Sequence, residues 1–119
     1  MRTLSAEAVA LTNVLLEHHA RVCRRPGGPP RDVDSCLIVY GTLCDRAGLP
    51  YLTRSVGNFL QEVAEWCSDN DWPPLNSLAV NQDSRMPGEG YDLAPGYSIL
   101  HWPDQLKACI AFSGYPSAV

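Results

Sequence analysis

The sequence has no long apolar run, no closely spaced pair of cysteines and no leader-like start. Its apolar stretches fall far short of the roughly 20 residues that a membrane-spanning helix requires, and its N-terminus does not resemble a signal peptide. The five cysteines are odd in number and include no CxxC motif. We therefore expect a cytoplasmic protein whose thiols are free and mostly buried. These are Cys23, Cys36, Cys44, Cys67 and Cys109.

Arrangements that support catalysis or metal binding are absent as well. There is no nucleophile elbow, and the glycine-rich segment 88–90 lacks the lysine of a phosphate-binding loop. His19 and Cys23 lie four residues apart, a spacing that suits a metal ion on a helix, but no second pair of ligands accompanies them. His18 falls on an apolar helical stripe, where a core histidine is the simpler interpretation. We expect no enzymatic activity, no bound metal and no cofactor.

Charge is unevenly distributed along the 119 residues. The chain holds 9 basic and 13 acidic residues, a net charge of −4. Residues 1–54 contain seven basic and five acidic residues, a balance of +2, and residues 55–119 contain two and eight, a balance of −6. Non-specific nucleic-acid binders neutralise phosphates with lysine and arginine, so we expect any nucleic-acid surface to be local and confined to the N-terminal half. The acidic half suits a basic partner.

The apolar periodicity and the positions of proline and glycine predict one small α+β domain over 1–119, of the winged-helix or helix–turn–helix kind with a short sheet. A proline- and glycine-rich connector is predicted at 26–35 and a loose tail at 113–119. Helices are expected over 5–24 with Ser5 as N-cap, 41–48, 54–68 with Thr53 as N-cap, and 103–112. Strands are expected over 36–40, 75–81 and 97–101, with a wing-like turn at 82–90. The buried face of the 54–68 helix is predicted to consist of Val56, Leu60, Val63 and Cys67.

Residues 41–68 fit a helix–turn–helix unit, with a short helix, a turn at 48–50 and a longer helix. Such units place the N-terminal part of their second helix against DNA. Here that part contains Thr53, Arg54, Ser55 and Asn58, whose side chains are of types that contact phosphates or bases. A plain pair of packed helices explains the same pattern equally well, so both interpretations stay open.

Four short segments in this region follow a recognisable order. They are Val39-Tyr40-Gly41, Ala47-Gly48, Arg54-Ser55-Val56-Gly57 and Leu60. In these segments the chain resembles the alkyltransferase-like proteins, the DNA-binding half of DNA-alkylguanine alkyltransferases. The resemblance implies a winged-helix-type domain that binds duplex DNA through the minor groove. It also implies that Arg54 enters the base stack and that Tyr40 helps to turn out a nucleotide, because an extruded base leaves a space that a side chain must fill.

The resemblance covers residues 39–60 and does not extend to the catalytic segment of the family. That segment is Pro-Cys-His-Arg, whereas residues 72–80 of this chain contain neither cysteine nor histidine. A thiolate nucleophile requires a cysteine and a group that activates it. Alkyl transfer is therefore excluded, and the resemblance implies binding alone.

The acidic half supports a second interpretation from a different class. Four carboxylates, on or just after the predicted 54–68 helix, are those of Glu62, Glu65, Asp69 and Asp71. In this interpretation the chain is an acidic inhibitor or adaptor of the anti-CRISPR kind, encoded by a phage or another mobile element. Its carboxylates would then occupy the channel of a basic protein that handles nucleic acids. The local motif favours DNA as the partner, and the global charge favours a protein.

Overall fold

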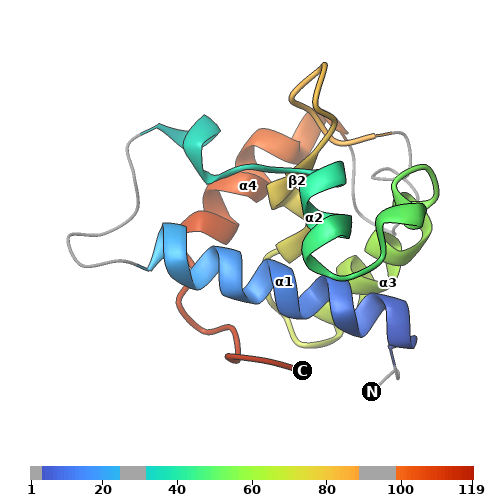
Figure 1. The fold of residues 1–119 in the computed structure, drawn as a ribbon. Helices are drawn as coiled ribbons and strands as arrows, with labels where there is room; N and C mark the ends of the chain where they lie inside the picture. The colour runs from blue at the N-terminus through green and yellow to red at the C-terminus, as the bar shows by residue number, and fades with distance from the viewer. Residues whose placement is uncertain (1–3, 25–31, 89–98) are drawn as a thin grey trace.

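A long amphipathic helix, α1, packs against most of the other elements. The computed structural model describes residues 4–24, 32–88 and 99–119, and α1 spans Ala6–Cys23. The helix begins where the sequence predicts, because the Ser5 hydroxyl accepts a hydrogen bond from the Ala8 backbone N–H at 3.2 Å. Leu11 and Leu15 lie on the face that packs into the core. In Figure 1 the helix crosses the front of the molecule.

The next part of the chain, residues 32–69, contains one strand and two α-helices. The elements are, in order, the 3₁₀-helix η1 (Val33–Cys36), β1 (Ile38–Val39), α2 (Tyr40–Arg46), the 3₁₀-helix η2 (Pro50–Leu52) and α3 (Val56–Asp69). Both α2 and α3 pack against α1. The buried face of α3 is the predicted one and includes Val56, Leu60, Val63 and Cys67. Of the predicted connector at 26–35, only 32–35 is described, and η1 occupies most of it.

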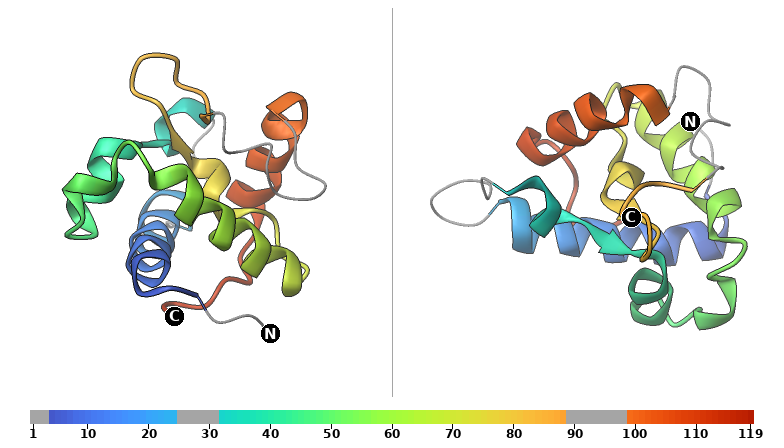
Figure 2. Two further views of the ribbon diagram at one scale, coloured as in Figure 1. Left: turned by 90° about the vertical axis from the view of Figure 1, so that its right-hand side faces the viewer. Right: turned by 90° about the horizontal axis from the view of Figure 1, so that it is seen from above.

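The centre of the molecule is a short buried segment. It consists of η3 (Leu75–Leu78) and β2 (Ala79–Val80), and every one of its residues is buried. This segment runs between α1 on one side and α4 (Trp102–Ala111) on the other, as Figure 2 shows. Strand β2 pairs with β1 in parallel, with Ile38 opposite Ala79 and Val39 opposite Val80.

The segment 113–119, for which a loose tail is predicted, has no regular secondary structure and is mostly exposed, but two contacts hold it against the rest of the molecule. Tyr115 is only 5% exposed, and its hydroxyl donates a hydrogen bond to the Pro73 carbonyl. Rings packed edge-on against Tyr115 are those of His19, Trp72 and Phe112. The Val119 backbone N–H donates to Asn13 Oδ1 at 2.7 Å, so the tail is held against α1. A buried tyrosine with a bonded hydroxyl is an effective anchor for such a segment.

All five cysteines are buried, and no disulfide joins any of them in the described residues, which include all five positions. Burial raises the pKa of the Cys67 thiol to about 12 and that of the Cys109 thiol to about 11. Neither group is a thiolate at neutral pH, so neither is a reactive nucleophile.

The described residues form a small α+β domain with four α-helices and a two-stranded parallel sheet. The finer winged-helix expectation is not confirmed, because a wing is an antiparallel hairpin and the two described strands are parallel. Across the three described ranges, no helix is both long enough and apolar enough to span a bilayer.

The predicted strands are shortened because helical turns take their ends. Cys36 closes η1 and Tyr40 opens α2, so the run 36–40 keeps only two strand residues. In the same way η3 takes the first four residues of the strand expected over 75–81. Residues 99–101 form the 3₁₀-helix η5 (Ile99–His101) in place of the strand expected over 97–101. Residues 82–84 form a turn, and residues 89, 90, 97 and 98 lie outside the described ranges.

Candidate functional site

The helix–turn–helix segment is present as α2, η2 and α3, but α3 begins later than predicted. Residues 53–55 continue the turn after η2: the Thr53 hydroxyl donates to the Pro50 carbonyl at 3.0 Å, and the Ser55 N–H donates to the Leu52 carbonyl at 2.9 Å. Thr53 therefore does not cap the helix, which was the expectation. Ser55 occupies the N-cap position, and no side chain caps α3.

This shift places most of the predicted contact residues on an exposed turn. We define the turn surface as Tyr51, Thr53, Arg54, Ser55 and Asn58, all of which are exposed. Tyr51 is 74% exposed, so its ring is accessible to a ligand. The guanidinium of Arg54 makes no hydrogen bond or ion pair with any described residue. The structure thus brings together four of the five predicted DNA-contacting residues and adds Tyr51.

The chemistry of the turn surface suits a polyanion with accessible bases. The guanidinium of Arg54 and the amide of Asn58 supply hydrogen-bond donors for phosphate oxygens or base edges. The hydroxyls of Thr53 and Ser55 already donate to the Pro50 and Leu52 carbonyls, at 3.0 and 3.5 Å. The phenol ring of Tyr51 provides a face for stacking. The uncapped N-terminus of α3 adds the positive end of a helix dipole beside Arg54. The guanidinium and the helix dipole favour a negatively charged ligand, and the exposed ring favours a ligand with flat bases.

Tyr40, the fifth predicted residue, does not belong to the turn surface. It is the first residue of α2, and its side chain contacts the segment 81–88. Its half-buried hydroxyl accepts a hydrogen bond from the Gly88 N–H at 2.7 Å. Burial raises the pKa of Tyr40, and the Gly88 bond opposes that rise. In this structure Tyr40 anchors the segment 81–88.

A second contact fixes the same segment, and sequence analysis did not anticipate it. The Arg85 guanidinium donates to both carboxylate oxygens of Asp34 at 3.1 and 3.3 Å and to the Asp34 carbonyl at 3.2 Å. The two residues are 51 positions apart, so no local pattern could reveal the pair. Arg85 is thereby engaged within the protein and is a poor candidate for binding a ligand.

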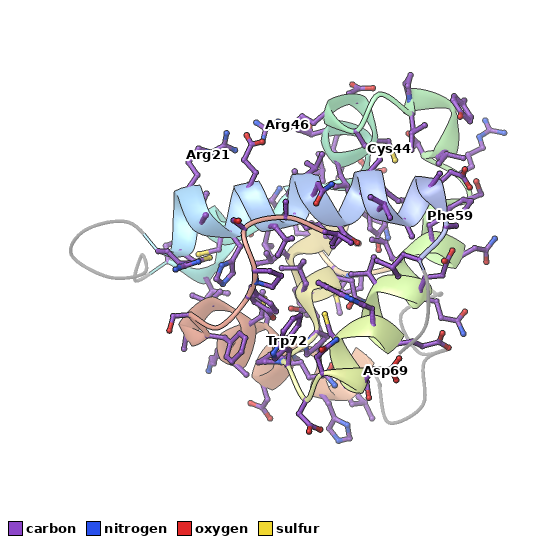
Figure 3. All side chains as sticks on the ribbon, turned by 90° about the horizontal axis from the view of Figure 1, so that it is seen from below. Arg21, Cys44, Arg46, Phe59, Asp69 and Trp72 are labelled. Carbon is purple, nitrogen blue, oxygen red and sulfur yellow. The ribbon has the colours of Figure 1, made fainter. Side chains whose placement is uncertain are left out.

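The four acidic residues of the alternative interpretation have different surroundings. Both carboxylate oxygens of Glu62 are used within the protein, because they accept hydrogen bonds from the Ser5 N–H at 3.0 Å and the Ser5 hydroxyl at 2.9 Å. Glu65 is half-buried, whereas Asp69 and Asp71 are exposed at the C-terminal end of α3. Figure 3 shows Asp69 directed away from the core. Asp69 and Asp71 are thus the two exposed members of the set.

The histidines of α1 are core residues. Nε2 of His19 bonds the Cys109 carbonyl and Nε2 of His18 bonds the Cys36 carbonyl, both at 2.8 Å. Since a carbonyl only accepts, each ring carries its proton on Nε2. Burial lowers the pKa of both rings, and Arg21 and Arg46 lower that of His18 further. In the part of the chain that is described, no group of three or more potential ligands is arranged to hold a metal ion.

Comparisons of this chain with protein-family models, with curated proteins and with solved structures find no match.

Proposed function

We propose that this chain is a non-enzymatic nucleic-acid-binding module that contacts duplex DNA through the turn surface. The observation that supports this most directly is Arg54, an exposed guanidinium without an intramolecular partner among the described residues, at the entry to the second helix of a helix–turn–helix segment. A long planar cation at this position has no evident structural role. It is well suited to a phosphate, a base edge or a gap in the base stack.

The neighbouring residues define how such a contact would work. Asn58 supplies an amide donor for a second phosphate or a base edge, and the N-terminus of α3 directs its dipole toward the anion that Arg54 binds. Tyr51 supplies an aromatic face for a base that is unstacked or turned out. The turn surface would then read the minor groove, with Arg54 filling the space left in the stack.

The alternative, an acidic module that binds a basic protein, retains support from one observation. Asp69 is the last residue of α3 and Asp71 follows it, and no basic residue lies in the last turn of that helix. Negative charge at a helix C-terminus is unfavourable, so these two residues are not there to stabilise the helix. Glu62 argues the other way, because its carboxylate is already bonded to Ser5.

Binding of a fluorescent duplex at low salt tests the proposal. Arg54→Ala should abolish binding, whereas Lys107→Ala, which removes an exposed cation from α4, should bind like the wild type. Asp69→Lys with Asp71→Lys should leave DNA binding intact or strengthen it. Capture of a basic protein that is lost in this double variant, together with no duplex binding at tens of micromolar wild-type protein, would establish the alternative instead.

A further inference from the structure

Arginine is concentrated at one end of α1, outside the turn surface. Residues 18–31 contain four of the nine basic residues of the chain and no acidic residue. Two of the four, Arg21 and Arg24, lie in the described residues at the C-terminal end of α1. Positive charge here complements the helix dipole, which is a sufficient structural reason for one arginine.

The tertiary structure adds a third arginine from a different helix. Arg46 is the last residue of α2, which packs across α1. Figure 3 shows the side chains of Arg21 and Arg46 extending along the same edge of α1. Arg21 and Arg46 both act on His18 electrostatically, as expected if the two guanidinium groups lie close to the same ring. We call Arg21 and Arg46 the arginine patch.

The guanidinium groups of the arginine patch are available to a ligand. Arg21 has one loose ion pair, with Glu17 at 4.0 Å, and the two side chains are 51% and 77% exposed. Such an exposed ion pair contributes little to stability, so a phosphate can replace Glu17 as the partner of Arg21. Arg46 is exposed, and its side chain makes no ion pair or hydrogen bond with any residue in the described ranges. The contrast is with Arg85, which is bound to Asp34 by three hydrogen bonds.

We propose that the arginine patch contacts the phosphodiester backbone of the duplex whose groove is contacted by the turn surface. This inference rests on the proposed function. Guanidinium groups on one edge match a row of phosphates, to which arginine binds in bidentate fashion. The patch and the turn surface also adjoin each other along the chain, because Arg46 ends α2 and the turn begins at Pro50. The patch supplies sequence-independent attraction, and the turn surface supplies the base contacts.

The salt dependence of duplex binding measures the contribution of the patch. The test variant is Arg21→Gln with Arg46→Gln, which removes two charges at exposed positions. The matched control is Lys107→Glu, which changes the net charge by the same two units on α4. Each phosphate contact that is lost lowers the slope of log K against log salt by about 0.9. The double variant should therefore have a slope about 1.8 smaller, and between roughly 50 and 200 mM salt the wild type should lose about tenfold more affinity than the double variant.

The outcomes separate the two proposals. The proposal for the arginine patch is wrong if the double variant binds the duplex with the wild-type slope. It is also wrong if Lys107→Glu reduces the slope equally. Either result leaves the proposal for the turn surface in place. No duplex binding by the wild type overturns both. Equal denaturation midpoints show that the variants are folded. An NMR titration adds an independent readout, since the pKa of His18 should rise when the two cations are removed and should not respond to Lys107→Glu.

Discussion

The contact between Glu62 and Ser5 leads to a quantitative prediction about stability. The carboxylate joins the middle of α3 to the start of α1, and the same serine caps α1 through its hydroxyl. A hydrogen bond to a charged group contributes about 1.5–3 kcal/mol. Both residues are half-buried, so the lower end of this range applies to each of the two bonds. We therefore expect Glu62→Ala to lower the free energy of unfolding by about 2–3 kcal/mol.

Urea denaturation at neutral pH measures this change directly. Glu62→Gln should lose about half as much stability, because an amide offers one acceptor oxygen where the carboxylate offers two. The control is Glu17→Gln, which changes a glutamate on α1 that is 77% exposed and has only a 4.0 Å contact with Arg21. Its effect should stay within about 0.5 kcal/mol of the wild type.

A Glu62→Ala protein as stable as the Glu17→Gln control would refute this reasoning. It would mean that water replaces both hydrogen bonds at no cost and that the carboxylate is free to act outward. A variant that keeps full stability but loses a protein partner would then favour the acidic-adaptor interpretation. A destabilised variant that still binds duplex DNA assigns Glu62 a structural role.

Two further predictions concern the buried histidines and thiols. Burial lowers the pKa of His18 and His19 below 6.5 in the folded state, so the unfolded chain takes up protons first. Stability should be full above pH 6.5 and should fall between pH 6.5 and the lowered pKa values, by up to about 1.4 kcal/mol per pH unit for each histidine; urea midpoints that are flat over this range would contradict the assignment. Thiol titration of the unreduced protein should be slow when it is native, because burial and the raised pKa values of Cys67 and Cys109 suppress the thiolate. It should approach five per chain in denaturant, and a count of three or fewer would show that disulfides are present.

Local sequence determined the helices and their buried faces. Ser5 caps α1 as predicted because an N-cap depends on atoms within three residues. The buried face of α3 was predicted for a similar reason, since Val56, Leu60 and Val63 repeat at helical spacing. Pro103 lies in the first turn of α4, as its fixed backbone angle favours.

The tertiary structure decided which polar and charged groups are free to act. Glu62 and Ser5 are 57 residues apart, and Tyr115 and Pro73 are 42 apart, so neither pairing leaves a periodic or short-range signal. Within the described residues each two-residue strand pairs only with the other, and helical turns occupy the remainder of the two predicted strands. Arg85 is removed from the set of available cations by Asp34, while Arg21 and Arg46 are brought to one edge by the packing of α2 on α1. Residue type is local information, whereas the availability of a side chain depends on contacts between distant segments.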